Sequence, residues 1–203
     1  MASEGRLYLF LMTSIAIVAS WWLGGVGSIF WCLPLLVLFL YRDPKRNVPA
    51  SPLGIISPVD GEVVAVENMH DRLLNRDALC IRIKPSLLSV FTIRSVTEGK
   101  VMQYWLDIDK TPTGPCVATN KCRAVWLQTD ENDDIVVLMQ AHPIHQLHCR
   151  VATGERIGQG QRCGFLLFSR YVDVFLPLDT RVDIKVGEKV LGGESPIAHL
   201  IHR

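Results

Sequence analysis

An uncharged apolar run near the N-terminus, at residues 7–41, most constrains what this 203-residue chain can fold into. As one straight helix the run would be about 50 Å long, whereas the hydrocarbon core of a bilayer is about 30 Å thick. Three glycines within residues 24–27 interrupt the run near its middle, where their low helix propensity favours a turn. The run therefore predicts a transmembrane helical hairpin, with helices at about 7–23 and 28–41.

Basic residues flank the run on both sides: Arg6 precedes it, and Arg42, Lys45 and Arg46 follow it. By the positive-inside rule this predicts a cell (inner) membrane protein whose remaining chain lies on the cytoplasmic side. The same cations attract anionic headgroups. A cleavable signal peptide is disfavoured because apolar sequence resumes after the glycines. The second helix is short, so full spanning and re-entry both stay open.

The composition excludes several classes of protein. The chain carries 21 basic and 20 acidic residues, so its net charge of +1 does not predict nucleic acid as a partner. The six cysteines lie at irregular spacings without a C-x-x-C pair, so we expect reduced, mostly buried thiols.

Beyond Pro49 the chain changes to short β-branched runs separated by Gly, Pro, Asp and Asn turns. These runs, without any long segment of helical period, predict a mainly β domain of twisted antiparallel sheets. We expect the membrane anchor at residues 1–46 and the β domain at 47–203. The segment 88–96 fits a strand or a short helix. The runs lie at 61–67, 78–85, 100–108, 122–129, 134–141, 172–177 and 181–186.

A short internal repeat also favours β architecture. A Gly-Glu-basic-aliphatic motif begins at Gly154 and again at Gly187, and a second glycine follows each copy three residues later. Glycines at such turns permit positive φ. The pattern is similar to the twisted hairpins of lipoyl-like barrel-sandwich domains.

Four segments carry motifs in a fixed order along the chain. They read YRDPKR at 41–46, ISPVDGEV at 56–63, GFLLFSRYVDVFLP at 164–177 and VGEKVLGGESPIAHL at 186–200. As an ordered set they resemble the short form of the phosphatidylserine decarboxylase family. The corresponding family motifs are F-R-D-P-x-R, S-P-x-D-G-x-V, G-x-I-R-F-G-S-R-V-D-V-Y-L-P and V-G-x-x-V-x-x-G-E.

The resemblance implies decarboxylation of phosphatidylserine to phosphatidylethanolamine, with CO2 released, by a pyruvoyl group that the chain makes from itself. In the family a serine hydroxyl attacks the carbonyl of the preceding glycine, and the ester then eliminates to leave the pyruvoyl group. The implied partners are a phospholipid membrane and phosphatidylserine as ligand. A homo-oligomer or an active paralogue is a further expectation.

An Asp–His pair activates the serine in this family. Asp60 matches the aspartate, although an Asp before Gly more commonly only sets a turn. Arg94 stands at the histidine position, and a guanidinium stays protonated and cannot act as a base. The family's N-E-R-N element reads N-K-C-R here, at 120–123.

The family's Gly-Ser pair is altered to Phe168-Ser169-Arg170. Aligned without gaps, Ser169 falls on the glycine and Arg170 on the serine, and an arginine cannot become a pyruvoyl group. With Tyr171 as an insertion, Ser169 is the candidate pyruvoyl precursor and the cleaved bond is Phe168–Ser169. A β-bulge could absorb that shift. The alternative is an ordinary strand serine.

His142, His145 and His148 follow one another at a spacing of three residues. They would drift around a helix or alternate across a strand, whereas zinc needs three or four convergent ligands. We therefore predict no metal site and favour surface or headgroup contact. A subsidiary hypothesis is that one of these histidines replaces the missing base.

Two functions therefore compete. The first is a pyruvoyl-dependent decarboxylase, and the second is a non-catalytic relative that binds lipid or regulates at the membrane. A carrier domain of lipoyl type explains neither the hairpin nor the V-D-V-F-L-P segment. The altered reactive centre favours impaired or absent decarboxylation.

Overall fold

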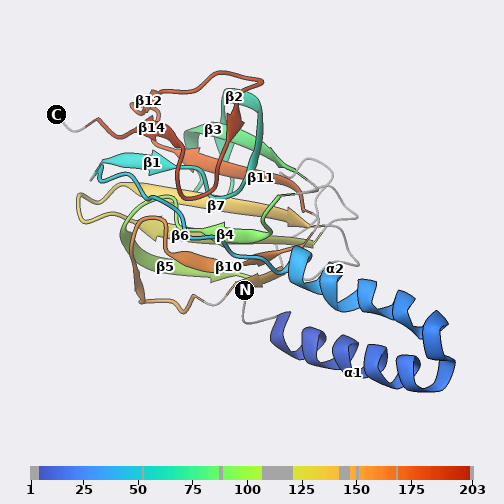
Figure 1. The fold of residues 1–203 in the computed structure, drawn as a ribbon. Coiled ribbons are helices and arrows are strands. Elements are labelled where there is room, and N and C mark those ends of the chain that lie inside the picture. The colour runs from blue at the N-terminus through green and yellow to red at the C-terminus, as the bar shows by residue number, and fades with distance from the viewer. Residues whose placement is uncertain are drawn as a thin grey trace. The chain divides into compact units, whose positions relative to one another are not determined.

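The computed structural model describes residues 5–51, 53–86, 89–106, 121–141, 147–149, 151–167 and 169–201. The chain divides into two compact units, Met1–Lys45 and Arg46–Arg203, each of which is described by itself (Figure 1).

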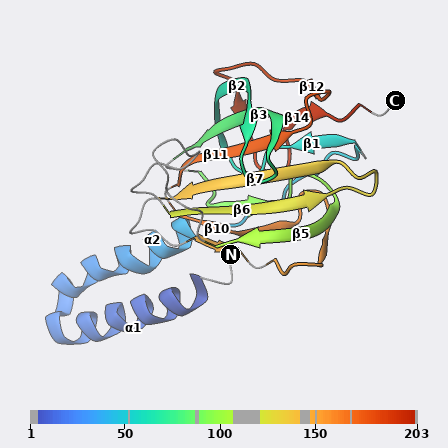
Figure 2. The ribbon, with the colours of Figure 1, turned by 180° about the vertical axis from the view of Figure 1, so that it is seen from behind.

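The N-terminal unit is a helical hairpin. Helix α1 (Gly5–Leu23) is followed by the 3-10 helix η1 (Gly24–Trp31) and by α2 (Cys32–Leu40), and both views show α1 and α2 side by side (Figures 1 and 2). The second α-helix thus begins four residues later than the sequence predicts, because the glycine segment itself is helical. Together these elements form a helical stretch that is long and apolar enough to cross a membrane.

Two contacts hold the hairpin closed. A side chain at Gly27 would lie 2.4 Å from the Ala19 carbonyl oxygen, so a glycine is required where the turn approaches α1. At the other end the rings of Tyr8 and Tyr41 stack, with their centroids 5.8 Å apart. Hydroxyls within α1 donate to carbonyls four residues earlier, which satisfies polar groups in an apolar helix.

The second unit consists of strands in curled antiparallel sheets, so the mainly β fold class with an N-terminal helical hairpin is confirmed. In the described part of the segment 88–96, at 89–96, β4 is the one strand. The strands are β1 (Gly54–Ile56), β2 (Gly61–Asp71), β3 (Arg76–Pro85), β4 (Thr92–Arg94), β5 (Gly99–Trp105), β6 (Lys121–Gln128), β7 (Asp134–Ala141), β8 (Leu147–Cys149), β9 (Arg156–Ile157), β10 (Arg162–Leu166), β11 (Ser169–Leu176), β12 (Arg181–Val182), β13 (Lys189–Val190) and β14 (Pro196–His199).

The strand order reveals two equivalent halves. The eight-stranded sheet runs β13-β2-β3-β11-β7-β6-β5-β9, so that β13, β2, β3 and β11 correspond to β9, β5, β6 and β7. The three-stranded sheets β1-β14-β12 and β4-β10-β8 correspond in the same way. Val174 of β11 pairs with Val137 of β7 where the halves meet.

Hydrogen bonds repeat between the halves. Val63 exchanges backbone hydrogen bonds with the Gly187 turn, and Val101 exchanges the same two bonds with the Gly154 turn. Both turn glycines have φ near +90°, which only glycine adopts easily. The sequence repeat seen at these glycines therefore marks a duplication of the fold. Because Val63 corresponds to Val101, Asp60 corresponds to Glu98, and each lies three residues before its valine.

Alternate residues of the central strands bury their side chains on opposite faces. Ile81, Val125, Val137 and Val174 belong to the main core, and a smaller cluster on the other face contains Cys80, Ala124, Leu138 and Phe175. Burying each large aliphatic side chain contributes about 1.5–3 kcal/mol, so these strands form the rigid frame for the loops between them.

The cysteines differ in part from the expectation of reduced thiols. Cys32, Cys80 and Cys163 are free. Cys122 at the start of β6 is disulfide-bonded, so the expectation is wrong there. Irregular cysteine spacing carries no information on which thiols come together in space, and this disulfide was therefore not predicted.

Candidate functional site

The Asp60 site lies in the loop between β1 and β2. The buried Ser57 hydroxyl donates to the carbonyl oxygen of Val59 at 2.7 Å, which tightens the turn before Asp60. Gly61 follows because a side chain there would lie 2.4 Å from the Lys84 carbonyl oxygen. The turn holds the Asp60 side chain in place, and this residue is only 8% exposed.

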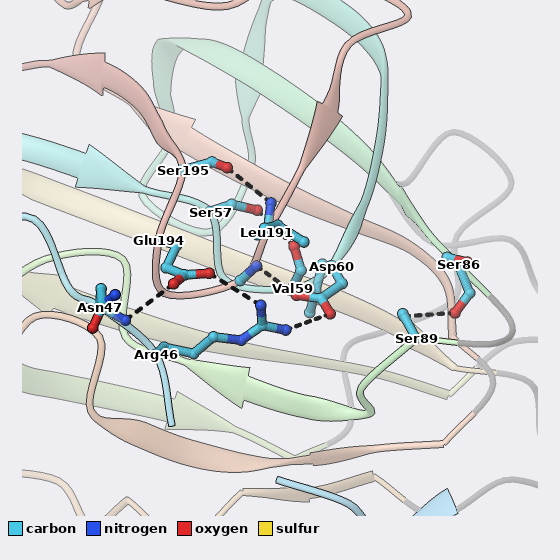
Figure 3. Close-up of polar contacts among 11 residues, drawn as sticks. Arg46, Asn47, Ser57, Val59, Asp60, Ser86, Ser89, Leu191, Glu194 and Ser195 are labelled. Atoms are coloured by element: carbon cyan, nitrogen blue, oxygen red, sulfur yellow. Dashed lines mark hydrogen bonds and ion pairs between the residues drawn. The ribbon is translucent and has the colours of Figure 1, made fainter. Parts of the chain in front are cut away.

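Both carboxylate oxygens of Asp60 are occupied. The Gly192 N–H donates to Oδ1 at 2.7 Å, and Arg46 Nη2 donates to Oδ2 at 2.7 Å (Figure 3). The other nitrogen of the same guanidinium, Arg46 Nη1, donates to Glu194 at 3.1 Å. One arginine therefore joins two carboxylates, from the β1–β2 loop and from the segment after β13. We call Arg46, Asp60 and Glu194 the arginine clamp.

The Asn47 N–H also donates to Glu194, at 3.1 Å. This backbone hydrogen bond and, next, the one from Arg46 lower the pKa of the Glu194 carboxyl. The clamp therefore holds Glu194 ionised and ties the segment that begins the second unit to a loop about 150 residues away in the sequence.

Arg94 lies beside the same loops. Its N–H donates to the Pro58 carbonyl oxygen at 3.0 Å, and its Nη1 donates to Gly160 at 3.1 Å. Gly193 makes room for it, since a side chain there would lie 2.5 Å from Arg94 Cδ. The structure thus brings Asp60 and Arg94 to one pair of crossing loops, as the family positions of an Asp–His pair would require.

Ser169 begins β11 and is 9% exposed. Its hydroxyl donates to the Gln140 carbonyl oxygen at 2.9 Å and lies 3.2 Å from the Tyr171 carbonyl oxygen. Ser169 pairs with Ala141, but Tyr171 pairs with Gln140, so Arg170 is an extra residue in the strand. The bulge that the inserted-residue alignment requires is present.

Farther along β11, Asp173 is fully buried. Arg82 of β3 donates to it through Nε at 2.7 Å and Nη2 at 3.1 Å, and Gln140 of β7 donates at 3.0 Å. The hydrogen bond to Asp173 raises the pKa of Arg82. The V-D-V-F-L-P motif around Asp173 is visible in the sequence, but this buried ion pair was not predicted from it.

A hollow of about 750 Å³ adjoins Asp60. Register places Glu62 of β2 between Lys189 of β13 and Lys84 of β3, so two cations flank one anion beside the hollow. Ser86 and Ser89 add hydroxyls to its lining. The remainder of the lining includes apolar Pro85, Val190 and Leu191.

The histidine cluster is only partly covered by the structure. His142 and His145 lie outside the described residues, and His148 belongs to β8, where it pairs with Phe165. Within the part of the chain that the structure describes, no group of three His, Cys, Asp or Glu residues could hold a metal ion. Replacement of the missing base by a histidine stays a hypothesis.

Comparison with known proteins identifies the class. The sequence model of the family described as phosphatidylserine decarboxylase matches residues 33–198. A phosphatidylserine decarboxylase proenzyme of Nitrosomonas europaea is 31% identical over 97% of this chain and 94% of its own length. Another, from Burkholderia vietnamiensis, is 34% identical over 98% of this chain and 95% of its own length. No solved structure matches.

The chain belongs to the phosphatidylserine decarboxylase family. This family acts on phosphatidylserine in membranes and depends on a pyruvoyl group. The altered residues of this chain, Arg94 and Phe168-Ser169-Arg170, are therefore interpreted by comparison with the chemistry of this family.

Proposed function

We propose that this chain is a membrane-attached protein of phospholipid metabolism that binds phosphatidylserine without converting itself to the pyruvoyl form. The carrying observation is Arg94 at the position of the family's histidine, because a guanidinium that stays protonated cannot be the base that activates a serine. A triad aspartate has to accept a hydrogen bond from the base that it orients. Asp60 accepts from Arg46 and from the Gly192 N–H, and the side chain at the base's position in the family is Arg94, which carries no lone pair to take a proton.

The contacts that Arg94 and Ser169 make support the same proposal. Arg94 donates to a backbone carbonyl and cannot take a proton from a serine hydroxyl at physiological pH. The hydroxyl of Ser169 donates to the Gln140 carbonyl oxygen, which is not a base. These contacts do not fit the formation of a pyruvoyl group from Ser169.

The hollow beside Asp60 suits the phosphatidylserine headgroup. That headgroup carries a phosphodiester anion, an ammonium cation and a carboxylate anion. The row Lys189–Glu62–Lys84 offers the opposite charges in an alternating order. Electrostatic complementarity of this kind gives specificity more than affinity.

Membrane attachment is the second part of the proposal. We infer that the hairpin α1–α2 lies in the cell (inner) membrane, with the β unit on the cytoplasmic side. The support is the apolar helical stretch Gly5–Leu40 with basic residues on both flanks. A homo-oligomer or an active paralogue stays a prediction.

The alternative function is decarboxylation after cleavage of the Phe168–Ser169 bond. The bulge at Arg170 favours it, because the bulge lets the Ser169-Arg170 pair keep the family's place in β11. The two functions therefore differ in whether the chain cuts itself.

A denaturing gel and the intact mass of the expressed full chain separate these functions. We expect one uncleaved chain of 22.7 kDa. Fragments of 168 and 35 residues, the shorter one blocked by a keto group, would overturn the proposal in favour of decarboxylation. In that case Ser169→Ala should abolish cleavage and Arg94→His should accelerate it.

Binding is tested with the full chain in nanodiscs of phosphatidylcholine, to which short-chain phosphatidylserine is added. Wild type should bind this lipid more tightly than short-chain phosphatidylcholine, and Lys84→Ala or Lys189→Ala should weaken binding several-fold. Lys100→Ala is the control, because Lys100 is the exposed counterpart of Glu62 in the other half. Equal affinity for the two lipids contradicts headgroup recognition.

A further inference from the structure

A second hollow, of about 270 Å³, is lined by Ala50, Ser51, Glu98 and Gln159. It lies at the same place in one half of the β unit as the Asp60 hollow does in the other. Ile56 donates its N–H to Val96, and Arg94 makes the corresponding bond to Pro58, so the two loops cross each other symmetrically. By this correspondence Glu98 stands for Asp60 and Ser51 for Ser89.

Ser51 belongs to a chain of hydrogen bonds that is not repeated among the described residues of the other half. Its Oγ lies 3.2 Å from Nε2 of His199. The other ring nitrogen of His199, Nδ1, contacts Oδ2 of Asp183. A carboxylate can only accept from Nδ1, so Nδ1 carries the proton and Nε2 is left as the acceptor for the Ser51 hydroxyl.

The fold holds each member of this chain in place. His199 of β14 pairs with Gly54 of β1 and with Arg181 of β12. Asp183 donates its N–H to Ile197 at 3.1 Å, and its Oδ1 accepts from Arg181 Nε at 3.1 Å.

Gly54 leaves room for the Ser51 hydroxyl. A side chain there would lie 2.6 Å from the Ser51 hydroxyl oxygen, which only the absence of a Cβ allows. The serine, the histidine and the aspartate thus come from three segments that the small sheet β1-β14-β12 brings together.

We infer that Ser51, His199 and Asp183 form an ester-hydrolysing site that opens on this second hollow. Ser51 Oγ attacks the carbonyl carbon of the ester while its proton passes to His199 Nε2. The bond to the alcohol breaks and the alcohol leaves with that proton. Water then attacks the acyl-serine, gives its proton to His199 and releases the carboxylic acid, and the proton returns to Ser51.

The lining of the hollow indicates the substrate class. A volume of about 270 Å³ lies just below the usual range for ligand sites, so the acyl group is short. Gln159 donates one amide N–H to Gly54, and the same amide nitrogen carries a second N–H that can stabilise the developing oxyanion. Glu98 at the hollow favours esters with a positively charged alcohol.

The test uses the full chain in detergent with a fluorophosphonate probe and with p-nitrophenyl acetate. We expect the probe to label Ser51, which mass spectrometry locates within the tryptic peptide 47–72. Ser51→Ala should abolish labelling. His199→Gln should lower the rate of ester hydrolysis about 10²-fold, as loss of a general base does.

His70→Gln is the matched control, since His70 contacts Asp77 through Nδ1 at 3.1 Å and faces Asn75 rather than a serine. It should leave labelling unchanged, and the unfolding midpoint of every variant shows whether the fold is kept. Gly54→Ala should reduce labelling by displacing the hydroxyl. Labelling no greater than in Ser51→Ala, or unchanged in His199→Gln, overturns the inference.

Discussion

Asp60 and Asp173 both lie in family motifs and both pair with an arginine, but their partners come from different parts of the fold. Asp173 is fully buried and receives Arg82 and Gln140 from the two strands beside it. Asp60 is 8% exposed and receives Arg46 from the segment 14 residues earlier and Gly192 from a loop 132 residues later. One aspartate therefore fixes strands, and the other fixes loops.

The two aspartates indicate where this chain can change without loss of its fold. An ion pair between neighbouring strands is held by the sheet itself, and removing one partner leaves a buried charge. The arginine clamp joins two loops and the segment before β1, and its three residues match the family motifs, whereas Arg94 beside it does not. The fold and the clamp are therefore retained in this sequence, and the change is confined to single positions such as Arg94 beside them.

Removing the arginine partner of Asp173 should lower the stability of the fold more than any other change considered below. Arg82→Met should lower the free energy of unfolding by about 3–5 kcal/mol, because Asp173 would stay buried with only Gln140 as partner. Urea unfolding of the full chain in detergent measures this. Arg170→Met, at the exposed bulge, should cost less than about 1 kcal/mol. A similar loss for both variants would mean that burial at Asp173 is unimportant.

Arg46→Ala should have a smaller effect, a loss of about 1.5–3 kcal/mol, since a charged hydrogen bond to Asp60 and another to Glu194 are removed. The same urea titration, followed by tryptophan fluorescence, measures it. Lys45→Ala is the control, as the neighbouring exposed cation. If Arg46→Ala behaved like Lys45→Ala, the arginine clamp would not stabilise the loops.

Ser169→Ala should cost about 1 kcal/mol, the usual value for one hydrogen bond, here from the serine hydroxyl to the Gln140 carbonyl oxygen. The intact mass should fall only by the one oxygen atom. Ser89→Ala removes an exposed hydroxyl that bonds the Ser86 carbonyl oxygen, and it should cost less. A stabilised Ser169→Ala variant would indicate a strained serine held for cleavage.

The smallest effect is on pH dependence. The pKa of Glu194 is lowered from its ordinary value of 4.5, so its contribution to stability is complete above that pH and is lost as the pH falls through the folded-state value. The stability gap between wild type and Glu194→Gln should therefore shrink on acidification from pH 7 to pH 3.5. In the Arg46→Ala background the gap at pH 7 should be narrower. A gap that widens on acidification contradicts the clamp.

The membrane segment and the β class could be predicted from the sequence because both rest on local patterns of apolar residues. Only one of the two pairs of repeated segments in the duplicated fold was recognised from the sequence. The Gly154 and Gly187 repeats were found, but the matching segments Ser57–Val63 and Ser95–Val101 were not. Their shared pattern S-x-x-D/E-G-x-V was the available signal.

The arginine clamp and the Ser51–His199–Asp183 chain could not be predicted. Each depends on contacts between residues about 150 positions apart, such as Arg46 with Glu194 or Ser51 with His199. Spacing along a sequence carries no information on such distances. The bulge at Arg170, by contrast, was one of two alternatives that the motif alignment itself raised.

The Tyr8–Tyr41 stack determines how the cations at the two ends of the hairpin can meet a charged lipid leaflet. By holding the two ends of the hairpin together, it brings Arg6 to the same depth as Arg42 and Lys45, which come just after Tyr41. Each cation near an anionic leaflet contributes about 1 kcal/mol of attraction. In the membrane arrangement proposed above, three such cations would face one leaflet, and binding of the anchor would then depend on the content of anionic lipid around it.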